Sequence, residues 1–160
     1  MDRIDTPALV LLPLRPEHAD EMAVVLSDPG LHTFIGGVPL TAQELRARYE
    51  RLAAGPPGWR NWVLWSREEE RLVGYVQATI EGGTAEIAWV IGTPWQGRGL
   101  ATAAARALVA HLADEGIGTV IAHIHPDHAA SAAVAGSAGL RPTDRWHDGE
   151  VRWELKIPYA

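Results

Sequence analysis

Residues 95–101, with the sequence WQGRGLA, form a glycine-rich segment between an apolar run that ends at Ile91 and an alanine-rich helical pattern. The first backbone N–H groups of a helix have no partner within the helix, and the helix dipole favours negative charge there. Glycine lets an anion approach this backbone closely because it has no Cβ. An ordinary strand-to-helix turn also uses glycine, so the flanking residues decide the interpretation. The spacing predicts a phosphate-binding turn, with Arg98 as a positive charge beside it.

Glu86 is the only charged residue in the apolar run 84–91. Glutamate is almost never fully buried without a partner or a chemical purpose. If helices cover both faces of this strand, burial raises the pKa of the Glu86 carboxyl toward the range that a general base requires. The sequence therefore makes Glu86 the candidate general base, with a structural pairing to an arginine as the alternative.

Hydrophobic periodicity and turn residues divide the chain into the elements that must position these groups. The expected strands are residues 9–14, 62–65, 72–80, 84–91, 119–124, 143–147 and 151–157. The expected helices are residues 16–26, 42–53, 99–114 and 126–138. The strand–helix–strand unit over 84–124 implies a parallel strand pair, and the short turns elsewhere imply antiparallel pairs. We therefore expect one domain over residues 1–160 with an α+β (mixed α/β) fold, in which helices cover both faces of a mixed sheet.

The residues QGRGLA at 96–101 match the pattern Gln/Arg-x-x-Gly-x-Gly/Ala, and with them the chain resembles the GNAT superfamily of acyl-CoA N-acyltransferases. Residues 14–27 look like the first strand and helix of that family, and residues 85–90 look like its fourth strand. HAAS at 128–131, followed by GLR at 139–141, looks like its Asn-x-x-Ser…Gly-Phe-Arg segment. This last pattern is most similar to the ribosomal-protein N-terminal acetyltransferase branch. The resemblance implies a central sheet of about six to seven strands.

The resemblance also implies acetyl-CoA as cosubstrate and a primary amine as acceptor, either a peptide N-terminus or a small molecule. Glu86 aligns with the glutamate that histone-acetylating relatives use as general base. Ser131 aligns with a helix serine near the thioester sulfur. The residues expected to bind acetyl-CoA are Ala88, Trp89, Val90, Ile91, Gln96, Gly97, Arg98, Gly99, Leu100, Ala101, Thr102, His128 and Ser131.

Three positions depart from the family pattern. Ala135 stands where many relatives carry a tyrosine general acid, Leu140 replaces the phenylalanine, and His128 replaces the asparagine that contacts the pantetheine arm. The tyrosines, which all lie outside the helix expected there, are Tyr49, Tyr75 and Tyr159. Ser131 is therefore the remaining candidate for the acid. These departures keep open a second hypothesis, a catalytically weak acyl-CoA-binding domain that acts as a sensor or scaffold.

Other chemistries fit the sequence less well. A Rossmann dinucleotide site is disfavoured because Thr102 occupies the third small position of the glycine pattern, and the Gly-Lys-Ser/Thr of a P-loop is absent. His123, His125 and Asp127 are metal-ligand types, but the resemblance places this segment beside the cofactor arm, so no metal is expected. No hydroxyl has a readable His–Asp arrangement that would indicate a hydrolase triad.

Seven tryptophans are a high count for 160 residues. Large aromatic side chains mostly fill cores, which is the default role of each. Together with residues 33–37 some of them can line an acceptor pocket, and Phe34 and Trp89 are the expected contacts. Such a pocket suits an apolar or flat amine better than a highly polar sugar.

Composition excludes several classes of protein. The chain has no cysteine, which rules out disulfides, thiol nucleophiles and thiolate metal sites. A net charge of −6 argues against nucleic-acid binding and mildly favours cationic substrates such as amines. No stretch approaches the roughly 18 apolar residues of a membrane helix, and residues 1–5 do not resemble a signal peptide. We expect a cytoplasmic monomer or homodimer that binds neither nucleic acid nor membranes.

Overall fold

The computed structural model describes residues 1–158, so Tyr159 lies outside the described residues. The strands are β1 (Ile4–Asp5), β2 (Leu9–Pro13), β3 (Trp59–Ser66), β4 (Arg71–Glu81), β5 (Thr84–Ile91), β6 (Thr119–Ile124), β7 (Arg141–His147) and β8 (Glu150–Lys156). The α-helices are α1 (Ala19–Val25), α2 (His32–Ile35), α3 (Ala42–Ala53), α4 (Leu100–Asp114) and α5 (Ala129–Ser137). Short 3₁₀ helices are η1 (Pro16–His18), η2 (Pro29–Leu31) and η3 (Thr93–Trp95). Among the described helices, none has the length and apolarity needed to cross a membrane.

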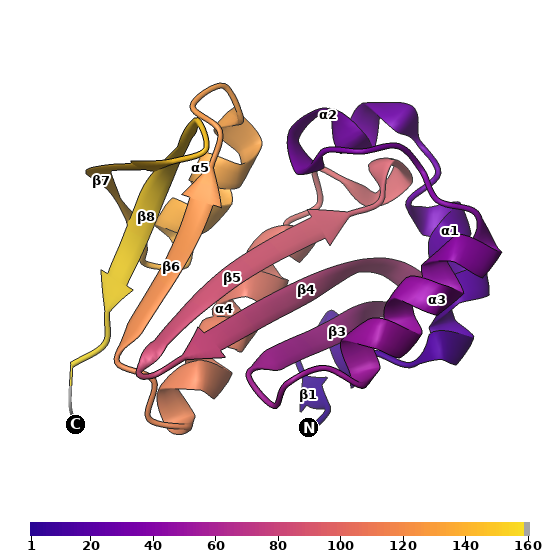
Figure 1. Ribbon diagram of the computed structural model, residues 1–160, viewed down its shortest axis with the longest axis horizontal. Coiled ribbons are helices and arrows are strands. Elements are labelled where there is room, and N and C mark those ends of the chain that lie inside the picture. The colour runs from indigo at the N-terminus through magenta and orange to yellow at the C-terminus, as the bar shows by residue number, and fades with distance from the viewer. Residues whose placement is uncertain (159–160) are drawn as a thin grey trace.

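All eight strands form one sheet in the order β1-β2-β3-β4-β5-β6-β8-β7 (Figure 1). The pair β5–β6 is parallel, and the other neighbouring pairs are antiparallel. The expected mixed sheet and its parallel pair are confirmed, with eight strands rather than six to seven. The additional strand, β1, has two residues and is therefore too short to produce a periodic pattern.

Most element boundaries agree with the sequence, and the differences have local causes. The predicted helix α3 is confirmed with its capping box, in which Thr41 and Glu44 exchange hydrogen bonds of 3.0 and 3.1 Å. The helix expected from residue 16 is divided into η1 and α1. β3 begins at Trp59 because that residue still pairs with Thr79 of β4. The four-residue helix α2 was not predicted, since one helical turn has no detectable period.

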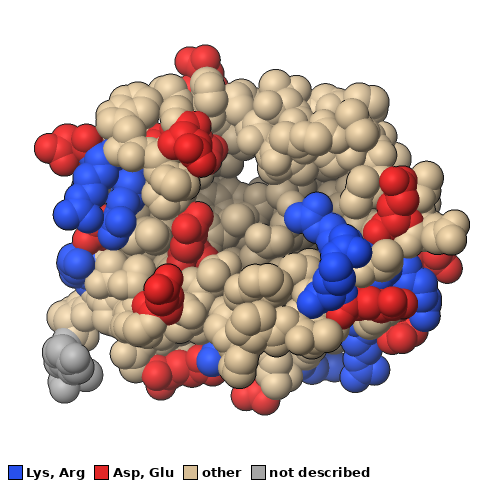
Figure 2. Space-filling model, in the orientation of Figure 1, with Lys and Arg blue, Asp and Glu red and all other residues tan. Residues whose placement is uncertain are grey.

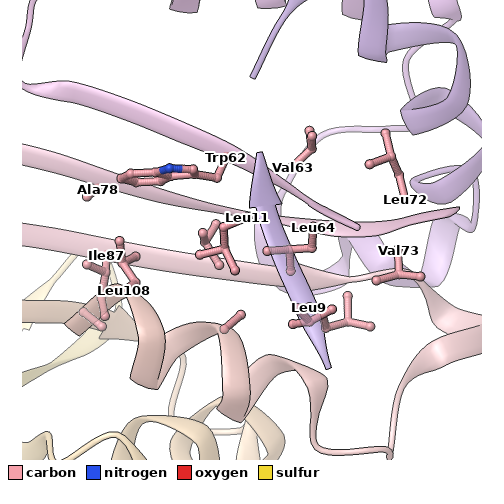
Figure 3. Close-up of a cluster of buried hydrophobic side chains, with 14 of the residues drawn as sticks. Leu9, Leu11, Trp62, Val63, Leu64, Leu72, Val73, Ala78, Ile87 and Leu108 are labelled. Carbon is pink, nitrogen blue, oxygen red and sulfur yellow. The ribbon is translucent and has the colours of Figure 1, made fainter. Parts of the chain in front are cut away.

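Two helical layers hold the sheet between them. In Figure 1, α1 and α3 cover one face at β3 and β4, and α4 lies behind the sheet at β4 and β5. Figure 3 shows the buried cluster on the α4 side, where Ile87 of β5 lies beside Leu108 of α4. The Trp62 ring is fully buried there, and its Nε1 donates to the carbonyl oxygen of Asp2 at 2.9 Å. Burying each large apolar side chain contributes about 1.5–3 kcal/mol, so β5 and α4 are held firmly relative to each other.

β5 and β6 separate after three paired positions. The pairs are Thr84 with Thr119, Ala85 with Val120 and Glu86 with Ile121. Beyond them, β5 continues to Ile91 paired with β4, and β6 continues to Ile124 paired with β8. Figure 1 shows the ends of the two strands pointing apart, toward α2 and α5. Within residues 1–158, the β6-facing edge of residues 87–91 therefore has no strand partner.

A glycine turns the chain at the end of β5. The Gly92 N–H donates to the Val73 carbonyl oxygen at 2.8 Å. A Cβ at Gly92 would lie 2.9 Å from the Val25 carbonyl oxygen and 2.8 Å from the Trp95 ring, which are distances that real Cβ atoms do not tolerate. Only glycine fits here, and η3 then leads the chain into the glycine-rich segment beside the open edge of β5.

Candidate active site

The glycine-rich segment forms an uncapped helix start. Gly97 and Gly99 both have φ of 78°, a left-handed conformation that glycine adopts without the Cβ penalty. Gly99 is the N-cap of α4, and no side chain caps the helix within the described residues. The first helical hydrogen bond runs from Ala103 N–H to the Gly99 carbonyl oxygen. The N–H groups of residues 100–102 are therefore free to bind an anion.

A cleft of about 520 Å³, here called the first cleft, lies between this helix start, the open edge of β5, α2 and α5. Its walls are Gly30, Leu31, Phe34, Ile35, Trp89, Val90, Ile91, Trp95, Gln96, Gly97, Gly99, Leu100, Ala101, Thr102, His128, Ala130, Ser131 and Val134. Figure 2 shows the molecule hollowed at its centre, and the visible walls of the hollow are mostly uncharged. The backbone therefore supplies much of the cleft's hydrogen-bonding capacity.

Most of the residues expected to bind acetyl-CoA meet in the first cleft. Both residues expected to contact an acceptor, Phe34 and Trp89, also line it. Ala88, Arg98 and Glu86 do not. The sequence interpretation missed Gly30, Leu31, Trp95, Ala130 and Val134, which line the cleft. The first three lie in the short 3₁₀ helices η2 and η3, which have no periodic signal.

Gln96 fixes the turn to the strand. Its Nε2 donates to the Ile91 carbonyl oxygen at 2.9 Å, which satisfies an acceptor at the end of β5. A side-chain amide can make this bond because Gln96 follows Ile91 after one short 3₁₀ turn. The glutamine thus braces the anion-binding turn against β5.

Arg98 lies outside the walls of the first cleft. Its Nη1 donates to Glu69 Oε1 at 2.6 Å, and 48% of the Arg98 side chain is exposed. Arg98 was expected to lie beside the bound anion, but it points to Glu69 instead. Exposed ion pairs contribute about 0–1 kcal/mol, so an anion at the turn competes with a weak interaction.

Glu86 is not buried, contrary to the sequence-based expectation. Its side chain is 51% exposed, whereas Ala85 and Ile87 on either side are buried. The cause is strand alternation, because α4 covers one face of β5 and α1 and α3 cover the other face at β3 and β4. The expected desolvation is therefore absent. The partner is a histidine rather than an arginine, since Glu86 Oε2 lies 3.1 Å from His123 Nδ1.

The Glu86 partner belongs to a short row of titratable groups. His123 is 12% exposed, and its ring centroid lies 5.0 Å from that of His147. His147 Nε2 lies 3.3 Å from an oxygen of Asp148. Among the described residues, no group of three or more His, Cys, Asp or Glu is arranged to hold a metal ion. The role of His123 as a partner of Glu86 was missed because it depends on the register between β5 and β6.

His128 and Ser131 face each other at the start of α5. Ser131 Oγ lies 3.3 Å from His128 Nε2. Burial lowers the pKa of His128 below its ordinary value, and the nearby His125 lowers it further. Ala135 and Leu140, which replace the family's tyrosine and phenylalanine, are both fully buried core residues. Ser131 is thus the only hydroxyl that α5 contributes to the first cleft among the described residues.

Phe34 connects α2 to this histidine. The Phe34 and His128 rings are stacked with centroids 4.1 Å apart and planes 10° apart, and Phe34 also lies 5.4 Å from His125. The contact joins the two sides of the first cleft, since α2 follows η2 on one side and His128 starts α5 on the other.

Several solved structures share the fold. A GNAT-family acetyltransferase from Bacillus anthracis superposes with a TM-score of 0.84 at 19% identity, over 97% of this chain and 98% of that chain. RimL, a ribosomal L7/L12 alpha-N-protein acetyltransferase in complex with coenzyme A, gives 0.84 at 19% identity over 98% of both chains. AAC(6')-Ib in complex with Parmomycin and acetyl-CoA gives 0.79 at 18% identity over 93% of both chains. At these identities the similarity shows the fold.

The family is shown by a sequence match. No curated protein has a matching sequence. The family model described as "Acetyltransferase (GNAT) domain", however, matches residues 8–141, which is most of the chain. That range contains the uncapped helix start, the open edge of β5, and the pairs Glu86–His123 and His128–Ser131. The chain therefore belongs to the GNAT family of acetyltransferases.

Proposed function

We propose that the protein transfers an acetyl group from acetyl-CoA to a primary amine by direct attack within a ternary complex. The observation that carries this proposal is that two backbone features with free hydrogen-bonding groups face the same cleft. The uncapped start of α4 and the open edge of β5 both face the first cleft. The first is suited to a pyrophosphate, and the second to the amide groups of a pantetheine arm.

Backbone groups of the chain hold the donor in this proposal. The N–H groups of residues 97–102 bind the pyrophosphate oxygens, and Gly99 leaves room for them. The edge of residues 88–91 pairs with the pantetheine amides as a neighbouring strand would. His128 and Ser131 contact the end of the arm from α5. In RimL and AAC(6')-Ib, coenzyme A and acetyl-CoA are the bound ligands, which supports this assignment.

Side chains at the separation of β5 and β6 handle the proton of the acceptor. The amine nitrogen forms a bond to the thioester carbonyl carbon, and the carbon–sulfur bond then breaks. The Glu86–His123 pair accepts the amine proton, directly or through water. The sulfur leaves as a thiolate anion, and Ser131 stabilises its negative charge by donating a hydrogen bond. The products are an N-acetyl amide and free coenzyme A.

The alternative is a domain that binds acetyl-CoA without turning it over. The positions at which this chain departs from the family pattern support it. Within residues 1–158, no tyrosine lines the first cleft, so the tyrosine acid of many relatives has no counterpart there. Acetyl-CoA turnover against a panel of amines, followed by detection of the free thiol, separates the two functions. Thiol release that depends on an amine establishes the enzyme. Acetyl-CoA binding by calorimetry without any amine-dependent release would establish the sensor or scaffold.

A further inference from the structure

A second cavity of about 320 Å³ lies between α1, α3, the connection from α2 to α3, and the sheet at β3 and β4. Its walls are Leu14, Ala23, Leu26, His32, Ile35, Gly36, Gly37, Val38, Leu40, Leu45, Arg48, Tyr49, Leu52, Asn61, Tyr75, Val76 and Gln77. This volume falls in the range of pockets for small molecules, which starts at about 300 Å³. None of the wall residues is an aspartate or a glutamate.

The second cavity adjoins the first cleft. Ile35 lines both spaces. On the sheet, Tyr75 of the second cavity pairs with Val90 of the first cleft across β4 and β5, and Gln77 pairs with Ala88. A molecule in the second cavity therefore lies one strand away from the β5 edge to which we assign the pantetheine arm.

Most of the cavity wall is apolar. Leucine, isoleucine, valine and alanine side chains from α1, α3, the α2–α3 connection and β4 contribute to it. At its rim, Ile35 is 44% exposed and Val38 is 71% exposed, although both are large apolar residues. Exposed apolar side chains at the rim of a pocket favour an apolar ligand that covers them.

Five polar side chains in the wall are free of protein partners. Within residues 1–158, no hydrogen bond or ion pair uses the side chains of Arg48, Tyr49, Asn61, Tyr75 or Gln77. Tyr49 and Asn61 are largely buried residues, whereas Arg48 is exposed. Among the described residues, none of these five side chains has a buried polar atom without a partner, so their polar groups are open to the cavity and available to a ligand.

Arg48 is the only Lys or Arg side chain in this wall. Burial raises the pKa of both Tyr49 and Tyr75. The positive charge of Arg48 acts against this increase in both cases. Arg48 itself is exposed, so a ligand can reach its guanidinium from solvent. A guanidinium in a partly apolar site is a specific partner for a carboxylate, with which it can form two parallel hydrogen bonds.

Resting on the proposed function, we infer that the second cavity selects the acceptor, and that this acceptor is a primary amine whose apolar body carries a carboxylate bound by Arg48. The free amide and hydroxyl groups of the wall orient its polar part. A polyamine or an aminoglycoside is a poor acceptor, because its additional ammonium groups meet Arg48 and no carboxylate in this cavity. An aromatic amino acid is the simplest molecule of the class.

The binding test compares two reaction products that differ only in charge, N-acetylphenylalanine and N-acetylphenylalaninamide. Neither carries an amine, so amine basicity does not affect the comparison. A hydrogen bond to a charged group is expected to favour the carboxylate by about 10- to 100-fold in affinity, measured by calorimetry in the presence of coenzyme A. In R48M this preference should disappear. In the matched control R51M, which changes an arginine of α3 outside the cavity, it should remain.

Turnover of phenylalanine and spermidine completes the experiment. Faster acetylation of phenylalanine by the wild-type protein, reduced in R48M and retained in R51M, supports the inference. Equal affinity for the two products, equal loss in R48M and R51M, or a preference for spermidine would overturn it. Spermidine acetylation would leave the proposed acetyltransferase function intact. Carboxylate-selective binding without any turnover would instead support the cavity and contradict the enzyme.

Discussion

The first cleft and the second cavity share the residue Ile35 but differ in which part of the chain supplies their hydrogen bonds. The first cleft uses backbone donors from one short segment, at Gly97, Gly99 and the start of α4. The second cavity offers polar side chains from α3, β3 and β4, which are far apart in the sequence. Backbone groups serve a ligand that every member of a family binds. Scattered side chains can change one at a time, so they suit a ligand that differs between members.

This difference predicts where substitutions act. Changes at the glycine turn should alter donor affinity whatever the acceptor is, because the pyrophosphate is common to all reactions. Changes in the second cavity should alter which amine is used and leave the affinity for coenzyme A unchanged. The Glu86–His123 pair lines neither space, and its effect should appear in the chemical step.

The largest expected effect is that of Glu86→Gln. The substitution keeps the size and the hydrogen bond to His123 but removes the basic carboxylate. Loss of a general base lowers the rate by about 10²- to 10⁴-fold, and we expect kcat to fall accordingly with unchanged affinity for coenzyme A. Glu81→Gln, at the β4–β5 turn and outside both pockets, is the matched control. Activity of Glu86→Gln within a few-fold of wild type would assign Glu86 a structural role.

The next effect is that of Gly99→Asp, which tests the backbone side of the comparison. Aspartate tolerates the left-handed conformation better than most residues, but its carboxylate would stand where the pyrophosphate is expected to bind. A like-charge repulsion of about 3 kcal/mol lowers the affinity for coenzyme A by about 100-fold. Gly116→Asp places the same residue at a φ of 88°, at the other end of α4, and should bind coenzyme A normally. If both variants bind equally well in calorimetry, the glycine turn does not hold the pyrophosphate.

Ser131→Ala should have a smaller effect, confined to the step in which the thiolate leaves. A hydrogen bond to a charged group contributes about 1.5–3 kcal/mol, so transfer at saturating acetyl-CoA should slow by roughly 10- to 100-fold. Donors with a better leaving thiol should be affected less. Ser137→Ala, at the other end of α5 and outside the first cleft, is the control. A fully active Ser131→Ala combined with an inactive Tyr75→Phe would move the acid from the first cleft to the second cavity.

The sequence predicted the first cleft well because its determinants are local. The glycine turn, the strand before it and the helix after it are consecutive, so residue type and spacing are sufficient to recognise them. Eleven of the thirteen residues expected to bind acetyl-CoA line the cleft; the exceptions are Ala88 and Arg98. Arg98 differs because its position depends on Glu69, a residue of the β3–β4 turn that no local pattern connects to it.

The exposure of Glu86 and the presence of the second cavity could not be predicted from local patterns. The exposure of Glu86 depends on how far the helical layers extend across β5, which is a property of helix packing. The second cavity depends on the simultaneous placement of Arg48, Asn61 and Tyr75 by three separate elements. Residues 33–37 were expected to line an acceptor pocket, and Ile35, Gly36 and Gly37 do line this cavity. Without α2 in the predicted fold, however, their position against α3 and the sheet could not be predicted.

The smallest expected effect concerns pH and the contact between Phe34 and His128, which joins the two sides of the first cleft. Burial and His125 lower the pKa of His128 from its ordinary value of 6.5, so the unfolded chain binds more protons than the folded protein as the pH falls below that value. The folded protein therefore becomes less stable relative to the unfolded chain as the pH falls. His18, whose pKa is also lowered by burial, contributes with the same sign. Urea unfolding of wild type between about pH 8 and about pH 5.5 should show this loss.

His128→Asn removes the titrating group and keeps a side chain that can hydrogen-bond to Ser131. The variant should lose less stability than wild type over the same pH range, while losing part of its stability at pH 8 because the ring contact with Phe34 is gone. Its affinity for coenzyme A should also depend less on pH, since the protonated imidazole no longer forms beside the first cleft. An identical pH dependence of stability in the variant and wild type would show that His128 is not titrating against the fold. The contact with Phe34 would then be packing alone.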